Sequence, residues 1–274
     1  MRTETRKKIK AKMPRPIWNA IASTYRKSFY SRYHKDMIRN PDKMELYCPC
    51  CGLKYRKFVV GDYEEYPDFY DLTTFEGIPS ELCCPVCESL PRHRIETLWC
   101  EQNIDLLKGK DILYFALERS IKLWMKRKGI TCTTADLFAE ADLKLDIQDT
   151  KLPDNSYDVV FCNHVLEHVD DYMKALRELY RIIRPGGSLI CSFPMSQDIE
   201  YVDEDPSVKT EEDRLRRFGQ SDHVRLFGMK ADRFMREAGF EVSIIDGDEC
   251  PKEVMPVIGP CKYDMNRLFW CKKT

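Results

Sequence analysis

The feature that most constrains the fold is an alternation of strand-like and helix-like patterns from about residue 101 to the last residues given. Short apolar runs such as "DILYFA" and "YDVVFCN" are separated by amphipathic segments such as "DDYMKALRELYRII". This alternation predicts an α/β fold in which a parallel sheet is covered by helices on both faces. Ligands of such sheets bind at the carboxyl ends of the strands, so one edge should carry the functional loops.

The same pattern predicts individual elements. Strands are expected at "DILYFA", "ITCTTADL", "YDVVFCN", "SLICSF", "EVSIID" and "RLFWCKK". Helices are expected at residues 119–128, ended by Gly129, and at "DDYMKALRELYRII", ended by "RPGG". A third is expected at "ADRFMREAGF", ended by Gly239. In the polar insertion before it, "TEEDRLRRFGQ" predicts a lid helix with Thr210 as its N-cap.

Two Cys-x-x-Cys pairs precede the alternating region. Cys48 and Cys51 lie in "CPCCGLKY", and Cys84 and Cys87 lie in "CCPVCESLPRHR". Four thiolates suit tetrahedral zinc, and four sulfur ligands leave no open position, so we expect a structural ion. A redox role for a lone Cys-x-x-Cys is the alternative.

Three neighbouring residues are further candidate ligands. Cys50 and Cys83 each stand directly beside a predicted ligand and are able to replace one, whereas His93 is expected to pack or bond locally. The chain has thirteen cysteines, and no signal-peptide pattern or apolar run of about 18 residues accompanies them. We therefore expect reduced thiols and a cytoplasmic protein.

The net charge of −1 hides a basic segment. Residues 1–39 hold twelve Lys or Arg and two Asp or Glu, about +10, so the remainder is about −11. From Pro16 to Arg39, apolar residues at steps of three and four predict a helix with one apolar stripe. Three interpretations stay open: a helix docked on its own domain, an amphipathic helix at an anionic membrane surface, and a nucleic-acid arm.

Acidic residues follow the predicted strands. Asp136 ends the second strand, where an acid can accept hydrogen bonds from both ribose hydroxyls of a nucleotide-like cofactor. Asp also caps helices, so this position alone is weak. Asp146 precedes "LPDNSYDVVF", and "NHVLEHVDD" follows that strand.

Together these residues resemble class I S-adenosylmethionine-dependent methyltransferases over residues 109–273. The resemblance is closer to a bacterial subgroup with an N-terminal zinc ribbon, an Ala-Pro-Glu first loop and a later motif that appears here as "GQSDHVR". It implies a Rossmann-like, seven-stranded methyltransferase sheet. It also implies three parts: a basic arm and helix (1–40), a zinc-ribbon module (41–100) and the methyltransferase domain (101–274).

The first loop departs from the glycine-rich form of the class. Tyr114 stands where an acid is usual, and Ala116, Glu118 and Ser120 stand where glycines are usual. S-adenosylmethionine has no phosphate to cradle, and Ala116 and Ser120 are small enough for backbone to approach it. Glu118 is expected to pair with the ammonium group of the cofactor or, alternatively, to cap the next helix. Leu117 replaces the proline of the subgroup.

The resemblance assigns further cofactor residues. Leu137 lies beside Asp136, Asp146 and Ile147 are expected near the adenine, and Asn163 and His164 begin the loop that faces the methyl group. Glu167 and His168 follow; His168 has either a direct role or a part in holding the next helix start.

On the acceptor side, His223 is the candidate base. Asp222 is expected to orient it, and Arg225 to hold an anionic acceptor group. The alternative is a structural ion pair between Asp222 and Arg225.

We expect transfer of a methyl group to a small-molecule or carbohydrate acceptor, at oxygen. The subgroup is associated with cell-surface polysaccharide biosynthesis, which suits a basic helix near an anionic membrane. An RNA methyltransferase is a second interpretation, although the body is acidic. A zinc-binding scaffold with a decayed methyltransferase domain is a third.

Overall fold

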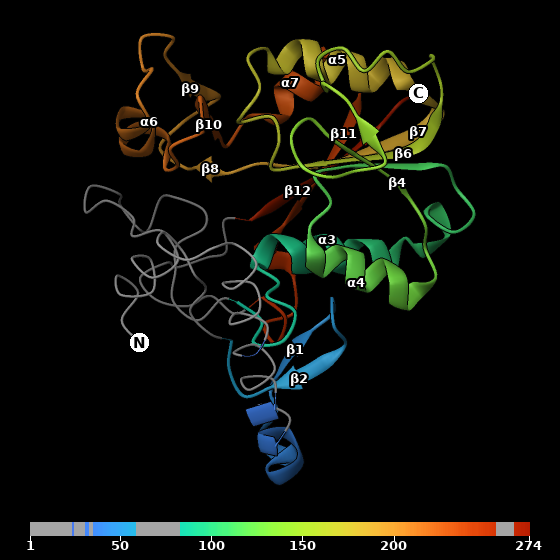
Figure 1. Ribbon diagram of the computed structural model, residues 1–274, viewed down its shortest axis with the longest axis vertical. Coiled ribbons are helices and arrows are strands. Elements are labelled where there is room, and N and C mark those ends of the chain that lie inside the picture. Colours follow the sequence, from blue (N-terminus) through green and yellow to red (C-terminus); the bar gives the residue numbers. More distant parts are fainter. Residues whose placement is uncertain (1–23, 25–30, 33–34, 59–82, 256–265) are drawn as a thin grey trace.

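The computed structural model describes residues 24, 31–32, 35–58, 83–255 and 266–274 (Figure 1). The predicted arm and helix at 1–40 lie largely outside the described residues, as does most of the connection between the two cysteine pairs. Residues 35–39 are helical, and a 3-10 helix, η1 (Pro41–Lys43), follows them.

A seven-stranded sheet forms the centre of the molecule, in the order β11-β12-β7-β6-β3-β4-β5. The strands are β3 (Ile112–Phe115), β4 (Thr133–Asp136), β5 (Leu143–Lys144), β6 (Tyr157–Asn163), β7 (Ile183–Ser192), β11 (Glu241–Asp246) and β12 (Arg267–Lys272). This sheet confirms the predicted Rossmann-like methyltransferase fold. One expectation is corrected, because β12 runs antiparallel to both β7 and β11, and the sheet is mixed.

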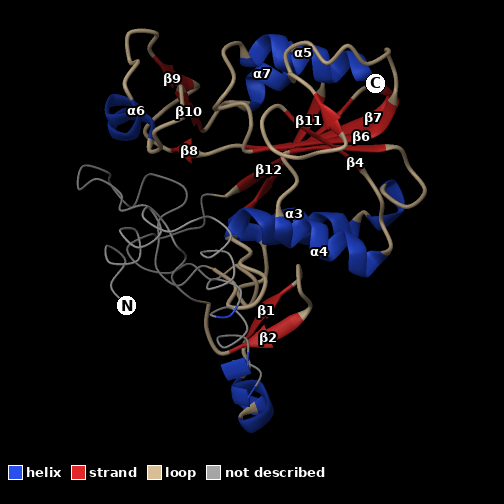
Figure 2. Cartoon of the chain, in the orientation of Figure 1, coloured by secondary structure: helices blue, strands red, loops and turns tan. Residues whose placement is uncertain are grey.

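Helices cover both faces of the sheet (Figures 1 and 2). On one face lie α5 (Tyr172–Ile182) and α7 (Asp232–Glu237), and on the other lie α3 (Pro91–Gln102) and α4 (Arg119–Lys128). Alternate residues of each strand supply the two cores. Leu113 and Phe115 join the core under α5, whereas Ile112 and Tyr114 join the core under α3 and α4.

Signals for helix ends in the sequence predicted the end of α4 and the start of α6. The helix α4 has the predicted bounds and ends at Gly129, which adopts the left-handed conformation with φ +68°. The predicted lid helix is α6 (Glu211–Phe218), and the Thr210 side chain accepts a hydrogen bond from the Asp213 amide. In contrast, "RPGG" lies inside β7, which begins directly after α5.

Several elements were not anticipated. The helix α3 crosses residue 100, where we expected the zinc-ribbon module to end. A three-stranded sheet of β8 (Met195–Ser196), β10 (Arg225–Gly228) and β9 (Val202–Glu204) forms in the insertion after β7. It lies beside α6, at the left of Figure 1. Two further 3-10 helices are η2 (Ile104–Leu106) and η3 (Gly247–Glu249).

The cysteine-rich module adjoins the α3 and α4 layer. It contains the antiparallel hairpin of β1 (Leu46–Cys48) and β2 (Leu53–Tyr55). Arg127 of α4 donates to the carbonyls of Pro49 and Cys50 in its turn, at 3.2 and 3.0 Å. Within the described ranges, every helix is too short or too polar to cross a membrane.

Candidate active site and metal centre

Three predicted cofactor residues lie at the carboxyl ends of adjacent strands. Asp136 ends β4, and its Oδ1 atom accepts from the amides of Phe138 and Ala139 at 2.7 and 2.6 Å, so it caps a turn instead of a helix. That turn leaves Leu137 about half exposed. Asp146 accepts from the Gln148 amide at 2.8 Å in the same manner. The structure thus brings both carboxylates to the predicted edge.

Buried side chains connect the central strands below this edge. Asn163 ends β6, and its amide nitrogen donates to the Tyr114 hydroxyl at 3.2 Å, while its oxygen accepts from Ser192 at 2.8 Å. Tyr114 in turn donates to Glu96 of α3 at 2.7 Å. Burial raises the pKa of Glu96 to about 8. A carboxyl group from α3 therefore lies under the position where the class usually has its strand-end acid.

The first loop has the strained geometry that glycine usually relieves. Ala116 has φ +52° in the left-handed region, where an L-residue is disfavoured. Ser120 lies in the first turn of α4, and its buried hydroxyl has no hydrogen-bond partner among the described residues. A buried polar atom of this kind calls for a partner. An orphaned donor at this loop fits a cofactor that carries polar groups.

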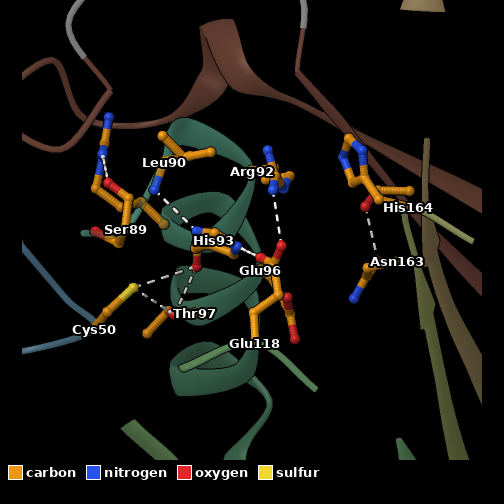
Figure 3. A network of polar contacts seen from close by, with 12 residues as sticks. Cys50, Ser89, Leu90, Arg92, His93, Glu96, Thr97, Glu118, Asn163 and His164 are labelled. Atoms are coloured by element: carbon orange, nitrogen blue, oxygen red, sulfur yellow. Dashed lines mark hydrogen bonds and ion pairs between the residues drawn. The ribbon is translucent and has the colours of Figure 1, made fainter. Parts of the chain in front are cut away.

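Glu118 is the N-cap residue of α4, but its side chain makes no capping hydrogen bond. Its carboxylate instead contacts Arg92 at 2.8 Å and His93, both from the start of α3 (Figure 3). Burial acts to raise the pKa of Glu118, and His93 and Arg92 outweigh this effect and lower it to about 2. The carboxylate expected to meet the ammonium group is thus already held by two side chains of α3.

His164 follows β6 and also has a left-handed backbone, with φ +53°. Its amide donates to the Ser192 carbonyl at 2.8 Å, which ties the loop to β7. Its Nδ1 atom lies 3.4 Å from Oε1 of Glu167. Burial lowers the pKa of His164, so this ring is neutral near pH 7. Strained backbone of this kind is frequent at functional loops.

The structure brings the predicted acceptor-side histidines together. The rings of His168 and His223 are edge to face, with centroids 4.8 Å apart. Asp222 contacts His168, with Oδ2 3.5 Å from Nδ1, and not His223 as we expected. His223 is buried and its Nδ1 atom donates to the Phe218 carbonyl at 3.1 Å. Burial lowers the pKa of His223.

Arg225 is a buried clamp on the loop after β6. Its guanidinium donates to the carbonyls of Leu166, Val169 and Asp170 and to the Glu204 carboxylate. Its ion-pair partner is therefore Glu204 and not Asp222. With these donors committed, the geometry favours a structural role over binding of an anionic acceptor.

The four predicted metal ligands meet in one cluster. The sulfur atoms of Cys48 and Cys87 are 3.6 Å apart, those of Cys51 and Cys84 are 3.8 Å apart, and all four lie within 4.8 Å of one another. A tetrahedral ion with sulfur ligands at about 2.3 Å requires sulfur separations of about 3.8 Å. The donor set and the spacing therefore fit one tetrahedral ion.

The alternative ligands lie elsewhere. The sulfur of Cys50 contacts Thr97 and the His93 carbonyl of α3, and Cys83 is directed to the Cys84 carbonyl. His93 accepts from the Leu90 amide at Nδ1, and its Nε2 atom contacts the Glu118 carboxylate (Figure 3). This ring serves the first loop and does not enter the sulfur cluster.

Sequence reasoning missed Arg92 and Glu96, and it named Glu167 without giving it a role. Arg92 and Glu96 lie on α3, a helix that the sequence patterns did not predict, so no sequence signal placed them beside the first loop. Glu167 had a visible signal, since it is a carboxylate inside the "NHVLEHVDD" loop. The structure adds its burial, with 1% of the residue exposed.

The two carboxylates Asp136 and Asp146 and the loop after β6 lie at the same edge of the seven-stranded sheet. Residues 121–191 match the model of a methyltransferase domain family. This segment runs from α4 to β7 and includes two of the three predicted cofactor carboxylates, Asp136 and Asp146, but not Glu118.

Individual relatives match over shorter spans. A demethylmenaquinone methyltransferase of Listeria monocytogenes is 42% identical over 59 residues, which is 22% of this chain and 25% of that protein. The chain thus spans about a quarter of the length of such relatives. Among solved structures, an S-adenosylmethionine-dependent methyltransferase of Archaeoglobus fulgidus is 15% identical with a TM-score of 0.45, covering 66% of this chain and 94% of that one. One from Mesorhizobium loti is 14% identical with a TM-score of 0.45, covering 65% and 97%.

Proposed function

We propose that this chain is an S-adenosylmethionine-dependent methyltransferase. The observation that carries the proposal is the placement of Asp136 and Asn163 at the carboxyl ends of β4 and β6, and of Asp146 just after β5, on one edge of a sheet of this order. When bound, the cofactor supplies an electrophilic methyl group. The protein has then to align an acceptor with that group and exclude water.

Each edge residue has a defined part in this proposal. Asp136 accepts from ribose hydroxyls, Asp146 accepts from the adenine amine with Ile147 against the ring, and the Ser120 hydroxyl takes a polar group of the cofactor. Asn163, Leu137 and His164 complete the wall of the cofactor site. Ala116 keeps the first loop backbone close to the methionine part.

The acceptor in this proposal is a small molecule or a carbohydrate, methylated at oxygen. Support comes from the insertion that carries α6 and the β8-β10-β9 sheet, which joins the site through the His168 and His223 contact. His223 stays the candidate base for a hydroxyl acceptor. The Cys48, Cys51, Cys84 and Cys87 cluster holds structural zinc in the same proposal. Membrane contact through residues 1–39 stays an expectation, because most of that segment lies outside the described residues.

Calorimetric titration with S-adenosylhomocysteine tests the cofactor site. Wild type should bind, and Asp136→Asn and Asp146→Asn should each weaken binding about 10- to 100-fold, because each removes a hydrogen bond to a charged group. Asn retains an oxygen for the local turn. Asp149→Asn is the matched control, since Asp149 is exposed and pairs with Lys151.

Equal affinity in wild type and Asp136→Asn would contradict the assignment. Absence of binding by a folded, zinc-loaded chain would favour the scaffold interpretation. With binding established, mass spectrometry of products from hydroxyl-bearing and amine-bearing acceptors tests transfer to oxygen. Salt-dependent binding of RNA would favour an RNA acceptor instead.

A further inference from the structure

A second group of metal-ligand side chains lies apart from the four cysteines. Glu167 and His168 come from the loop after β6, and His223 comes from the segment before β10. One ligand atom of each lies within 4.8 Å of the others. The Val224 amide donates to the Glu167 carbonyl at 3.0 Å, so backbone pairing holds the two segments together.

Glu167 is the unusual member of this group. It is 1% exposed, and neither of its carboxylate oxygens has a hydrogen-bond partner within the described part of the chain. The Nε2 atom of His168 lies 3.8 Å from its Oε1 atom. The Nδ1 atom of His164 lies 3.4 Å from the same oxygen, whereas the Oε2 atom has no hydrogen-bond partner among the described residues. A buried, ionised carboxylate that lacks full compensation costs on the order of several kcal/mol. A cation between these side chains would supply that compensation.

The two histidines are oriented as metal ligands are. The Nδ1 atom of His223 donates to the Phe218 carbonyl at 3.1 Å, and the Nδ1 atom of His168 lies 3.3 Å from the Asp222 carbonyl oxygen. With both Nδ1 protons committed, the lone pair of each ring is on Nε2. Metal-binding histidines characteristically donate their other nitrogen to a carbonyl or carboxylate.

We propose that Glu167, His168 and His223 bind a divalent transition-metal ion. Two imidazole nitrogens and one carboxylate suit Zn²⁺ or Fe²⁺. Three protein ligands leave a coordination position open, which distinguishes this site from the closed cysteine cluster. A metal on Nε2 of His223 excludes a base role for that nitrogen, so the two assignments of His223 are alternatives.

Metal content of the full chain tests the proposal. The protein is stripped of metal, reloaded with Zn²⁺, freed of excess ion by gel filtration and analysed by mass spectrometry. Wild type should hold two ions per chain, and Glu167→Gln should hold one. The control Glu204→Gln, a nearby carboxylate that pairs with Arg225, should hold two.

Cobalt reloading identifies which site is lost. Co²⁺ bound by thiolates gives charge-transfer absorption, and Co²⁺ bound by imidazole and carboxylate does not. Glu167→Gln should keep the thiolate band while losing one equivalent, which also shows that the variant is folded. His168→Gln, at a position about one-third exposed, is a second variant with the same expectation. One ion per wild-type chain, or two ions in both variants, would overturn the proposal.

Discussion

The Nε2 atom of His93 in α3 contacts the carboxylate of Glu118, the N-cap residue of α4. The second cysteine pair leads directly into α3, so this contact joins the cysteine module to the first loop of the candidate cofactor site. Arg92 donates to the same carboxylate at 2.8 Å. The first loop, which contains no glycine, is therefore held by side chains from outside the sheet.

The Arg92 and Glu118 pair should couple measurably. In a double-mutant cycle of Arg92→Gln and Glu118→Gln, we expect a coupling of about 0.5–1 kcal/mol in the free energy of unfolding, because the pair is partly screened by solvent. The Arg119 and Glu88 pair joins the same segments but is more exposed, so its coupling should be smaller. Equal couplings would show that the first pair has no special role. Urea unfolding provides the measurement.

Replacement by serine should have opposite effects on metal binding at the adjacent residues Cys50 and Cys51. Cys51→Ser should remove one bound ion per chain and destabilise the module, because a structural site needs its full ligand set. Cys50→Ser should retain that ion, since the Cys50 sulfur contacts Thr97 and lies outside the cluster. Metal analysis and chelator-induced unfolding distinguish the two variants. Loss of the ion in Cys50→Ser would show that the ligand set is wrong.

Glu96 should make stability depend on pH. Burial raises the pKa of Glu96 to about 8, whereas an unfolded Glu titrates near about 4.3. Between these values the folded chain keeps a proton that the unfolded chain has released, so stability falls as pH rises. Glu96→Gln removes this term and still accepts from Tyr114. Its advantage over wild type should grow to the order of a few kcal/mol by about pH 8.

Unfolding curves at about pH 5.5 and about pH 8.5 measure this difference. Tyr114→Phe is the companion variant. The Tyr114 hydrogen bond lowers the pKa of Glu96, so its removal should extend the pH-dependent loss to higher pH. Parallel stability profiles for wild type and Glu96→Gln would refute the assignment.

Replacement by glycine should have opposite effects on the free energy of unfolding at Ala116 and at Ala175. Ala116→Gly should raise the free energy of unfolding by about 0.5–1 kcal/mol, because glycine adopts φ +52° without strain. Ala175→Gly should lower it by about 1 kcal/mol or more, because Ala175 is buried inside α5. Thermal unfolding of both variants is the measurement. A destabilised Ala116→Gly would mean that the methyl group contributes packing that outweighs the backbone strain.

Local signals in the sequence predicted several helix boundaries well. Gly129 marks the end of α4 and Thr210 the start of α6, because both act through backbone geometry within one turn. The strands of the small sheet were missed since they have two to four residues, too few to show a period of two. The helix α3 was missed because residues on several of its sides are buried, which erases the amphipathic pattern.

In the candidate site, too, some residues were predicted from local sequence patterns, whereas the contacts of others depend on tertiary packing. Asp136 was predicted because it ends its strand, and Asp146 because it precedes "LPDNSYDVVF" in the run that carries the resemblance. The meeting of His168 with His223, and of Glu118 with His93, depends on tertiary packing between segments far apart in sequence. The roles of the remaining site residues depend on where their side chains point. The Arg225 side chain, for example, contacts backbone carbonyls and Glu204.

The position of α3 limits how this protein can be divided or rearranged. The helix begins directly after the cysteine pair, yet Ile95 and Trp99 belong to the same core as Trp124 and the central strands. Trp99 packs edge to face on Trp270 of β12, with centroids 5.4 Å apart. Cutting the chain at residue 100 would remove the apolar side chains of α3 from the sheet and expose an apolar surface. A cut that keeps this core intact therefore lies before residue 91, and not at residue 100 as the sequence suggests.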